Sequence, residues 1–231
     1  MRFLSIIAVC LSLLPNISAS QDAVVVELFT SQGCSSCPPA DQLVRDLARQ
    51  HDDIIVLGWH VDYWDYLGWK DEFSSPAYTA RQAGYRDHWR LRSLYTPQIV
   101  VHGRDEMVGS NTQKVMSAIA DVRTNMQMLS MVVTPRGGLV DVLVTPLESN
   151  LLGSEILLIK VLPRAAIDIL RGENAGKQIE YINTVRNVSV ISQWDSRSPV
   201  TVNGIDPAAG PYVLLIQARG YGPILGAQML R

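Results

Sequence analysis

Apolar positions in the first part of the chain switch between strand-like and helix-like spacing. Val24–Thr30 and Ile54–His60 are nearly continuous apolar or β-branched runs, typical of strands buried on both faces. Between them, apolar residues recur at helical spacing behind a pair of prolines, which suit a first helical turn. The helix-spaced positions are Ala40, Leu43, Val44, Leu47 and Ala48.

The following segment continues this alternation and completes the order β-α-β-α-β-β-α. Capping residues and short apolar runs predict four more elements there. They are a helix from Ser75 and Pro76 to about Leu91, strands over Gln98–His102 and Glu106–Val108, and a helix that begins at Ser110 or Asn111.

From about Met131 onward, short β-rich runs replace the helical periodicity. Pro135–Gly138 predicts a hairpin turn, and Arg171–Gly176 predicts a loop. We therefore expect an α/β protein, with a first domain over residues 22–129 and a β-rich, mainly antiparallel domain or extension over residues 130–231. The expected strands are Met131–Thr134, Leu139–Thr145, Ile156–Leu162, Ile179–Ile191, Tyr212–Ala218 and Ile224–Leu230.

The first residues have the three parts of a secretory signal peptide. Arg2 gives a positive start, Phe3–Leu14 is an apolar run, and Ser18–Ser20 supplies small residues for cleavage. The run is shorter than the roughly 20 residues that a membrane-spanning helix needs, so a membrane anchor is the weaker interpretation. We expect residues 1–19 to be removed on export and the mature chain to have no transmembrane segment.

Composition limits the partners and isolates one pair of cysteines. The formal net charge is -2 and neither half is strongly basic, which argues against electrostatic binding of nucleic acid. Of the three cysteines, Cys10 lies in the predicted signal peptide. Cys34 and Cys37 would then be the only thiols of an exported chain, in a compartment where disulfides persist.

Cys34 and Cys37 lie between a predicted strand and the start of a predicted helix. Unpaired N–H groups and the helix dipole favour a thiolate there, and such thiols have pKa values of roughly 3.5–7.5. Cys34 is therefore the candidate nucleophile, and Cys37, one turn further, would resolve a mixed disulfide. Two alternatives are an inert disulfide, which would stabilise the fold weakly, and a metal site, which lacks a second cysteine pair.

Four segments of the chain carry a family resemblance. VVELFTSQGCSSCPPAD, WHVDYWDYLGWKDEF, YTPQIVVHGR and GPILGA span nearly the whole chain after the predicted signal peptide. They resemble a family of exported bacterial thioredoxin-like proteins that is catalogued as a domain of unknown function. The resemblance implies a thioredoxin-like domain over residues 22–129 and a periplasmic or secreted location, but it implies no substrate.

Thr96 and Pro97 match a pair that precedes a strand in the thioredoxin superfamily. There the proline is cis and lies against the two cysteines, so the resemblance implies a groove where the backbone beside Pro97 pairs with a substrate chain. A trans proline at the start of an edge strand is the alternative. Thr96 and Pro97 are therefore candidate substrate-binding residues.

The sequence departs from common thioredoxins in two places. Ser35–Ser36 separates the cysteines instead of Gly-Pro, and the loop after the second strand is unusually aromatic. Trp64 in this loop is a candidate for the substrate-binding rim, because aromatic side chains anchor interfaces. Core packing of the loop is the competing interpretation.

Three polar residues are candidates for tuning the cysteine pair. Glu27 lies on an otherwise apolar strand, where a buried carboxylate would relay protons. An exposed or ion-paired carboxylate is the alternative. His60 and Asp62 close the second strand, at the edge where α/β folds bind ligands. A packed, hydrogen-bonded histidine is the competing interpretation for His60.

These observations favour an exported thiol–disulfide oxidoreductase that acts on protein or small-molecule thiols and uses no cofactor. Its redox direction depends on a reduction potential, which a motif does not give. One alternative is a metal carrier in which Cys34, Cys37 and His60 bind a soft ion such as Cu(I). Another is a non-enzymatic interaction module, in which the β-rich half binds a partner and the disulfide only stiffens a loop.

Overall fold

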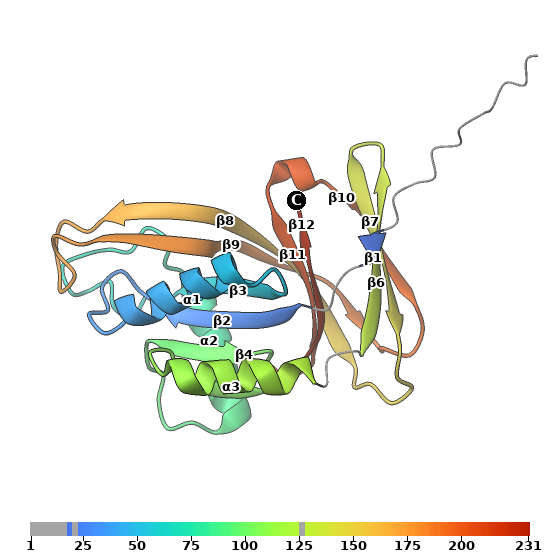
Figure 1. Ribbon diagram of the computed structural model, residues 1–231, viewed down its shortest axis with the longest axis horizontal. Coiled ribbons are helices and arrows are strands. Elements are labelled where there is room, and N and C mark those ends of the chain that lie inside the picture. The colour runs from blue at the N-terminus through green and yellow to red at the C-terminus, as the bar shows by residue number, and fades with distance from the viewer. Residues whose placement is uncertain (1–17, 20–22, 125–127) are drawn as a thin grey trace, which may run out of the picture.

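The computed structural model describes residues 18–19, 23–124 and 128–231, and it is a mixed α/β protein (Figure 1). The predicted signal peptide lies outside the described residues, apart from positions 18–19. No helix in the described ranges is long and apolar enough to cross a membrane.

The α-helices and β-strands follow one another in this chain order: β1 (Ser18–Ala19), β2 (Val24–Thr30), α1 (Pro38–Gln50), β3 (Ile54–His60), α2 (Pro76–Trp89), β4 (Gln98–Val101), β5 (Asp105–Val108), α3 (Thr112–Arg123), β6 (Leu129–Arg136), β7 (Leu139–Pro146), β8 (Ser154–Asp168), β9 (Gln178–Trp194), β10 (Val200–Ile205), β11 (Tyr212–Ala218) and β12 (Ile224–Leu230).

The predicted element order of the first part is confirmed from β2 to α3. Ser75 caps α2 as expected, because its side chain accepts the Ala77 N–H at 3.2 Å. Of the two candidate caps for α3, Asn111 is the one used, since its side chain accepts the Lys114 N–H at 3.1 Å. Local capping signals therefore predicted these helix starts correctly.

The second part differs from the prediction in strand length and number. β8 and β9 have 15 and 17 residues, because their backbone pairing continues beyond the apolar runs into a two-stranded arm. β10 was not predicted. A register shift after Val202 and a positive φ of 70° at Gly204 interrupt the alternation that would have marked this strand.

The two parts of the chain share one eight-stranded sheet, with the order β12-β11-β8-β9-β3-β2-β4-β5. β2 and β3 are parallel, β4 is antiparallel to β2, and β9 joins β3 in parallel where Thr184 lies opposite Gly58. The other neighbouring pairs in this sheet are antiparallel. A second sheet has the order β1-β6-β7-β10.

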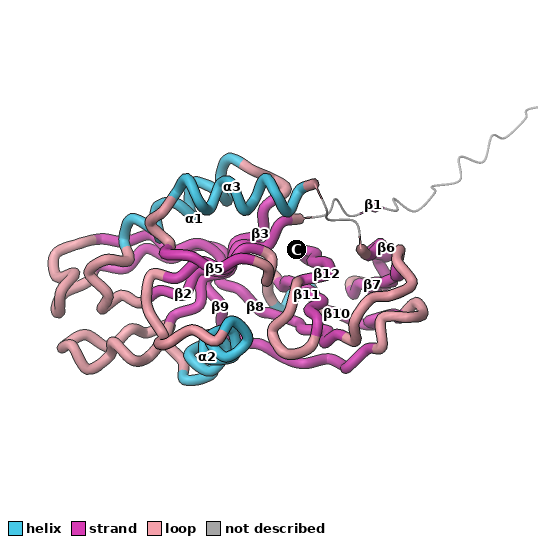
Figure 2. Tube along the Cα trace, turned by 90° about the horizontal axis from the view of Figure 1, so that it is seen from below, coloured by secondary structure: helices cyan, strands magenta, loops and turns pink. Residues whose placement is uncertain are grey.

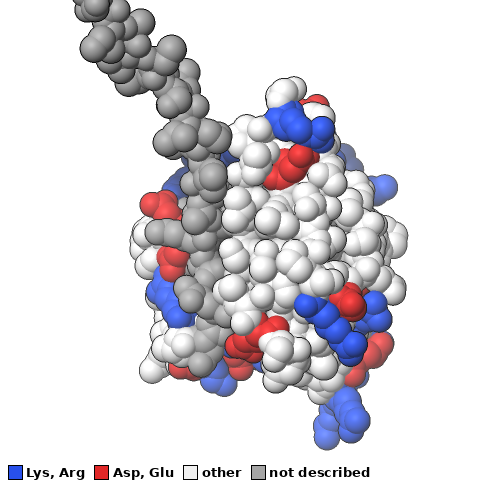
Figure 3. Space-filling view, turned by 90° about the vertical axis from the view of Figure 1, so that its right-hand side faces the viewer, with Lys and Arg blue, Asp and Glu red and all other residues white. Residues whose placement is uncertain are grey.

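Helices cover both faces of the β2–β3 region, with α1 and α3 on one face and α2 on the other (Figure 2). Because side chains alternate along a strand, Val24, Val26 and Leu28 pack towards α1 and α3, whereas Val25 and Phe29 pack towards α2. A third apolar core joins the four-stranded sheet to β11 and β12. The outer side of that end of the molecule is mainly uncharged at its centre (Figure 3).

The turn between β4 and β5 packs against the segment that leads into β12. Gly103 has a φ of 64°, and a Cβ there would lie 2.6 Å from the Gly222 carbonyl oxygen. Beside it, the His102 carbonyl accepts the Ile224 N–H at 2.9 Å, and the His102 N–H donates to the Val25 carbonyl at 2.7 Å. This turn therefore links β2 to the C-terminal strands.

Replacing Gly103 should destabilise the fold more than replacing a glycine with the same backbone geometry but open surroundings. Gly137→Ala, with a φ of 60° and nothing within 4 Å, should cost about 1–2 kcal/mol for left-handed backbone alone. Gly103→Ala should cost about 1–3 kcal/mol more, because the backbone must move away from the methyl group. Denaturant unfolding of both variants measures the difference, and equal losses would contradict the close packing of this turn.

Candidate functional site

The site is built around a disulfide between Cys34 and Cys37, whose Cα atoms are 5.4 Å apart. It lies where β2 ends and α1 begins, and the Cys37 carbonyl accepts the first helical N–H groups, from Ala40 at 2.9 Å and Asp41 at 3.1 Å. Cys37 is fully buried, whereas Cys34 keeps 2% of its surface exposed. Both cysteines are therefore buried, and Cys34 is marginally the more exposed of the two.

Of the predicted substrate-binding residues, Thr96 contacts Cys34 directly and Trp64 contacts Thr96. The Thr96 hydroxyl donates to Cys34 Sγ at 3.2 Å, and Trp64 Nε1 donates to Thr96 Oγ1 at 2.7 Å. The Thr96–Pro97 peptide bond is cis, as predicted. Trp64 therefore forms part of the wall beside the disulfide, with its polar atom directed at Thr96.

Asn174, in the loop between β8 and β9, holds the disulfide loop and was not predicted. Its side-chain Nδ2 donates to the carbonyl oxygens of Gln32 and Cys34, each at 2.9 Å. Lys177 Nζ donates to Asn174 Oδ1 at 2.8 Å, which fixes the orientation of the amide. The only sequence signal was the predicted loop itself, because the contact spans 140 positions from Cys34.

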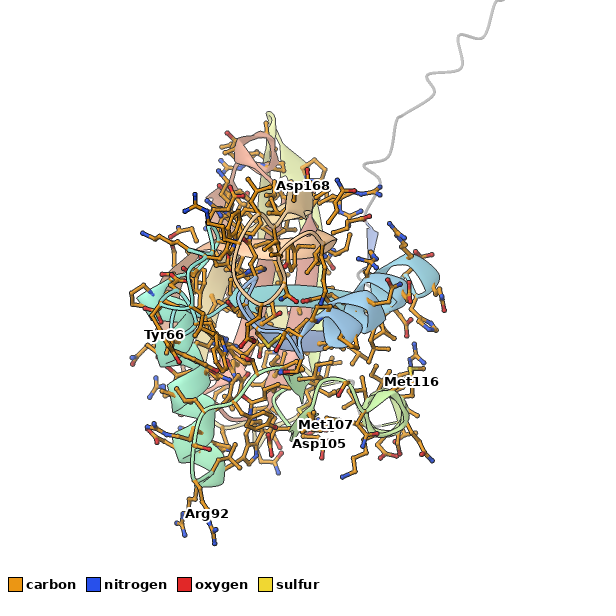
Figure 4. The ribbon with its side chains drawn as sticks, turned by 90° about the vertical axis from the view of Figure 1, so that its left-hand side faces the viewer. Tyr66, Arg92, Asp105, Met107, Met116 and Asp168 are labelled. Atoms are coloured by element: carbon orange, nitrogen blue, oxygen red, sulfur yellow. A yellow bond between two sulfur atoms is a disulfide. The ribbon has the colours of Figure 1, made fainter. Side chains whose placement is uncertain are left out.

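The same β8–β9 loop packs against the aromatic loop that follows β3. A Cβ at Gly172 would lie 3.2 Å from the Leu67 carbonyl oxygen and 3.2 Å from Trp69 Cβ. Tyr66 is 77% exposed and lies at the outer edge of the molecule, and Asp168, where β8 ends, lies above it (Figure 4). The two loops thus form the exposed end of the molecule beside the disulfide.

His60 is fully buried and pairs with Asp71 rather than with a sulfur atom. Its Nδ1 lies 2.7 Å from Asp71 Oδ2, and Asp71 also accepts the N–H groups of Gln32 at 2.8 Å and Phe73 at 2.9 Å. Burial alone would raise the pKa of Asp71, but His60 and these hydrogen bonds lower it below its usual value. An ionised Asp71 only accepts, so His60 Nδ1 carries the proton.

Asp62 lies away from the disulfide contacts. The Asp62 carboxylate accepts a hydrogen bond from the Thr79 hydroxyl at 2.6 Å. The Asp62 backbone N–H donates to Thr79 Oγ1 at 3.2 Å. Asp62 therefore holds the start of the aromatic loop against α2.

Glu27 is buried in an ion pair on the α2 side of the sheet. Its carboxylate accepts Arg81 Nε at 2.7 Å and the Tyr85 hydroxyl, while Arg81 Nη2 donates to Gln217 at 3.0 Å. Burial raises the pKa of Tyr85 well above its usual value, which keeps this hydroxyl protonated. Glu27 is thus fully engaged in a charge-paired cluster.

The alternative metal ligands are not grouped together. Within the part of the chain that the structure describes, no three His, Cys, Asp or Glu side chains are placed to hold a metal ion. Cys34 and Cys37 are bonded to each other, and His60 Nδ1 is directed at Asp71. In this state neither sulfur is a thiolate ligand.

The fold and the site define a mixed α/β protein with a CxxC disulfide at a helix N-terminus. The chain belongs to the family described as protein of unknown function DUF1223, whose model matches residues 25–211. A crystal structure of an Agrobacterium tumefaciens protein, from a structural genomics programme, is similar with a TM-score of 0.78 and 29% identity, over 91% of this chain and 96% of that one.

A more distant similarity concerns the fold alone. HBP35 of Porphyromonas gingivalis matches with a TM-score of 0.58 and 11% identity, over 90% of this chain and 74% of that one. A search of the curated proteins found no match.

Removing the Asn174 side chain should loosen the disulfide loop. Asn174→Ala leaves the buried Gln32 and Cys34 carbonyls without this donor, which should cost about 1–3 kcal/mol of unfolding free energy. Hydrogen exchange of the amides over residues 32–37 should speed up in parallel. The matched control is Asn187→Ala, whose exposed amide donates to Ser189 at 3.3 Å. Similar effects from both variants would show that Asn174 does not hold the loop.

Neutralising Glu27 should destabilise the protein without changing the chemistry of the disulfide. Glu27→Gln leaves the buried charge of Arg81 unpaired, which should cost about 3–5 kcal/mol. The control Asp53→Asn breaks a partly exposed pair with Arg123 and should cost about 0–1 kcal/mol. Chemical denaturation gives both values. A changed rate of disulfide reduction in folded Glu27→Gln would instead favour a tuning role.

Proposed function

We propose that residues 22–129 form a thioredoxin-like domain and that the protein is an exported thiol–disulfide oxidoreductase. The observed order from β2 to α3 supports the first statement, together with a parallel β2–β3 pair and an antiparallel β4. The disulfide at the start of α1 and the cis Thr96–Pro97 bond support the second.

The observation that carries the proposed chemistry is the environment of Cys34 Sγ. The Thr96 hydroxyl donates to it at 3.2 Å, and Cys34 is the more exposed of the two cysteines. In the reduced protein, the same hydroxyl and the N-terminus of α1 would stabilise a Cys34 thiolate. The buried Cys37 would then be the resolving cysteine.

The proposed reaction is reversible exchange of one disulfide for another. The Cys34 thiolate attacks a substrate disulfide, forms a mixed disulfide and releases one substrate sulfur as a thiolate. Cys37, after losing its proton, attacks Cys34 Sγ and releases the second substrate sulfur. The substrate gains two electrons, the cysteine pair loses two, and the Cys34–Cys37 disulfide is restored. The reverse sequence oxidises a substrate dithiol.

The substrate in this proposal is a protein or small-molecule thiol or disulfide. Ser35 and Ser36 are exposed beside the disulfide, and the exposed Tyr66 lies on the neighbouring loop. Ser36 Oγ lies 3.5 Å from Cys34 Sγ, so a docking substrate would meet these side chains first.

Single-cysteine variants test the proposal. Cys37→Ser should accumulate a mixed disulfide through Cys34, because nothing remains to resolve it, whereas Cys34→Ser should trap no partner. Non-reducing gels and mass spectrometry, after exposure to glutathione disulfide or to a disulfide-bonded model protein, provide the measurement. Equal trapping by both variants would remove the assigned roles. Full insulin-reductase activity in Cys34→Ser would overturn the proposed role of Cys34 as the attacking cysteine.

A further inference from the structure

A small cavity lies between α1 and the sheet, on the side opposite Glu27. Asp41 from α1, His60 from β3, and Tyr181 and Thr184 from β9 line it. It offers about 10 Å³ to the centre of a water molecule, close to the roughly 10–15 Å³ that one buried water needs. All four residues are at least nine-tenths buried.

Each of these residues brings a polar atom without a partner among the described residues. The four atoms are His60 Nε2, Asp41 Oδ2, Tyr181 Oη and Thr184 Oγ1. A buried polar atom left unsatisfied costs about 1–3 kcal/mol. Four such atoms around a single cavity are unusual in a folded protein, whose buried polar groups are nearly all paired.

We propose that the cavity binds one water molecule, and that this water joins Asp41 to His60 so that the two side chains share a single proton. A water molecule makes two to four hydrogen bonds, which matches the set of polar atoms around the cavity. His60 Nδ1 already gives its proton to Asp71, so Nε2 is the atom that exchanges a proton with Asp41 through the water.

The groups around Asp41 determine the proton affinity of the shared site. Burial raises the pKa of Asp41 to about 7, against the opposing effects of His60 and of the Thr30 hydroxyl, which donates to Asp41 Oδ1 at 2.9 Å. Asp71 raises the pKa further, and Arg45 lowers it. Tyr181 and Thr184 face the cavity from β9, and burial raises the pKa of Tyr181, which keeps it neutral.

This proton-sharing pair lies behind the disulfide. The Asp41 N–H donates to the Cys37 carbonyl at 3.1 Å, so Asp41 is one helical turn beyond the buried cysteine. Asp71, on the other side of His60, holds the Gln32 N–H two residues before Cys34. The next step rests on the proposed function. A Cys34 thiolate formed on reduction raises the proton affinity of the Asp41–His60 pair, and by reciprocity the bound proton favours reduction of the disulfide.

The first test uses the oxidised full chain and needs no redox activity. Carbon-detected NMR should show the Asp41 carboxyl titrating near pH 7, with the His60 Nε2 resonance changing over the same range. Asp41→Asn should remove that transition from His60, whereas Asp46→Asn, which changes a partly exposed carboxylate on the same helix, should leave it. Titration of Asp41 near pH 4, or a high-resolution structure with an empty cavity, would overturn the proposal.

The pH dependence of stability gives an independent readout. Folding raises the pKa of Asp41 above its unfolded value, so the folded state binds more protons between about pH 4 and pH 7. Its stability should therefore fall as pH rises through this range. Asp41→Asn should lose this component of the fall, and Asp46→Asn should keep it. An unchanged pH profile in Asp41→Asn would contradict the shared proton.

A second variant and a second measurement keep the two proposals separable. If Asp41→Asn does not fold, Thr184→Val removes one partner of the water and should shift the Asp41 titration. The pH dependence of the Cys34–Cys37 midpoint potential should change slope near pH 7 in the native chain and in Asp46→Asn, but not in Asp41→Asn. If Cys34 and Cys37 are never reduced and reoxidised, the oxidoreductase proposal is wrong. The Asp41 titration still tests the shared proton in that case. If the disulfide is reduced and reoxidised normally but its midpoint potential shows no change of slope near pH 7, only the coupling between the shared proton and the disulfide is contradicted.

Discussion

The parallel contact between β3 and β9 is the constraint on which the rest of the structure depends. It is made at Gly58, opposite Thr184, where a Cβ would lie 3.4 Å from the Ile182 carbonyl oxygen. This approach brings the long β8–β9 hairpin along the first part of the chain. Its loop then reaches the disulfide through Asn174, and β9 closes the polar cavity behind it. The C-terminal region is therefore part of the site.

The strands at the centre of the sheet separate two polar clusters with different character. Glu27 faces α2, where Arg81 and the Tyr85 hydroxyl donate to its carboxylate, and Gln217 bonds both of these partners. On the opposite face, Thr30 donates to Asp41, which lines one cavity with His60 and keeps one oxygen without a partner among the described residues. The free-energy cost of deprotonation is small for an acid whose anion is paired with a cation. It is large for a buried carboxyl group with a hydrogen-bond partner on only one oxygen. This half-satisfied burial is why the pKa of Asp41 is raised to about 7.

Local signals in the sequence were sufficient for much of the fold and for half of the site. Apolar periodicity and caps located β2 to α3. The family resemblance placed Thr96 and Pro97 near Cys34, and the aromatic character of the loop after β3 singled out Trp64. Asn174 and Asp71 could not be found in this way, because their roles depend on partners 140 and 39 positions distant. The aspartates at 41 and 71 lie within the quoted motifs, but nothing local shows that both face His60. β10 was missed because its irregular register hides the alternation.

The charges near the disulfide explain what the shared proton does. Asp71 is ionised, so the cluster of Asp71, His60 and Asp41 carries one negative charge while the proton is held between the last two. Losing that proton places a second negative charge one turn into α1, against the helix end that would stabilise a Cys34 thiolate. A thiolate and a second buried carboxylate therefore oppose each other. The neutral Asp41–His60 pair allows the interior to remain polar without weakening the helix N-terminus as an anion site.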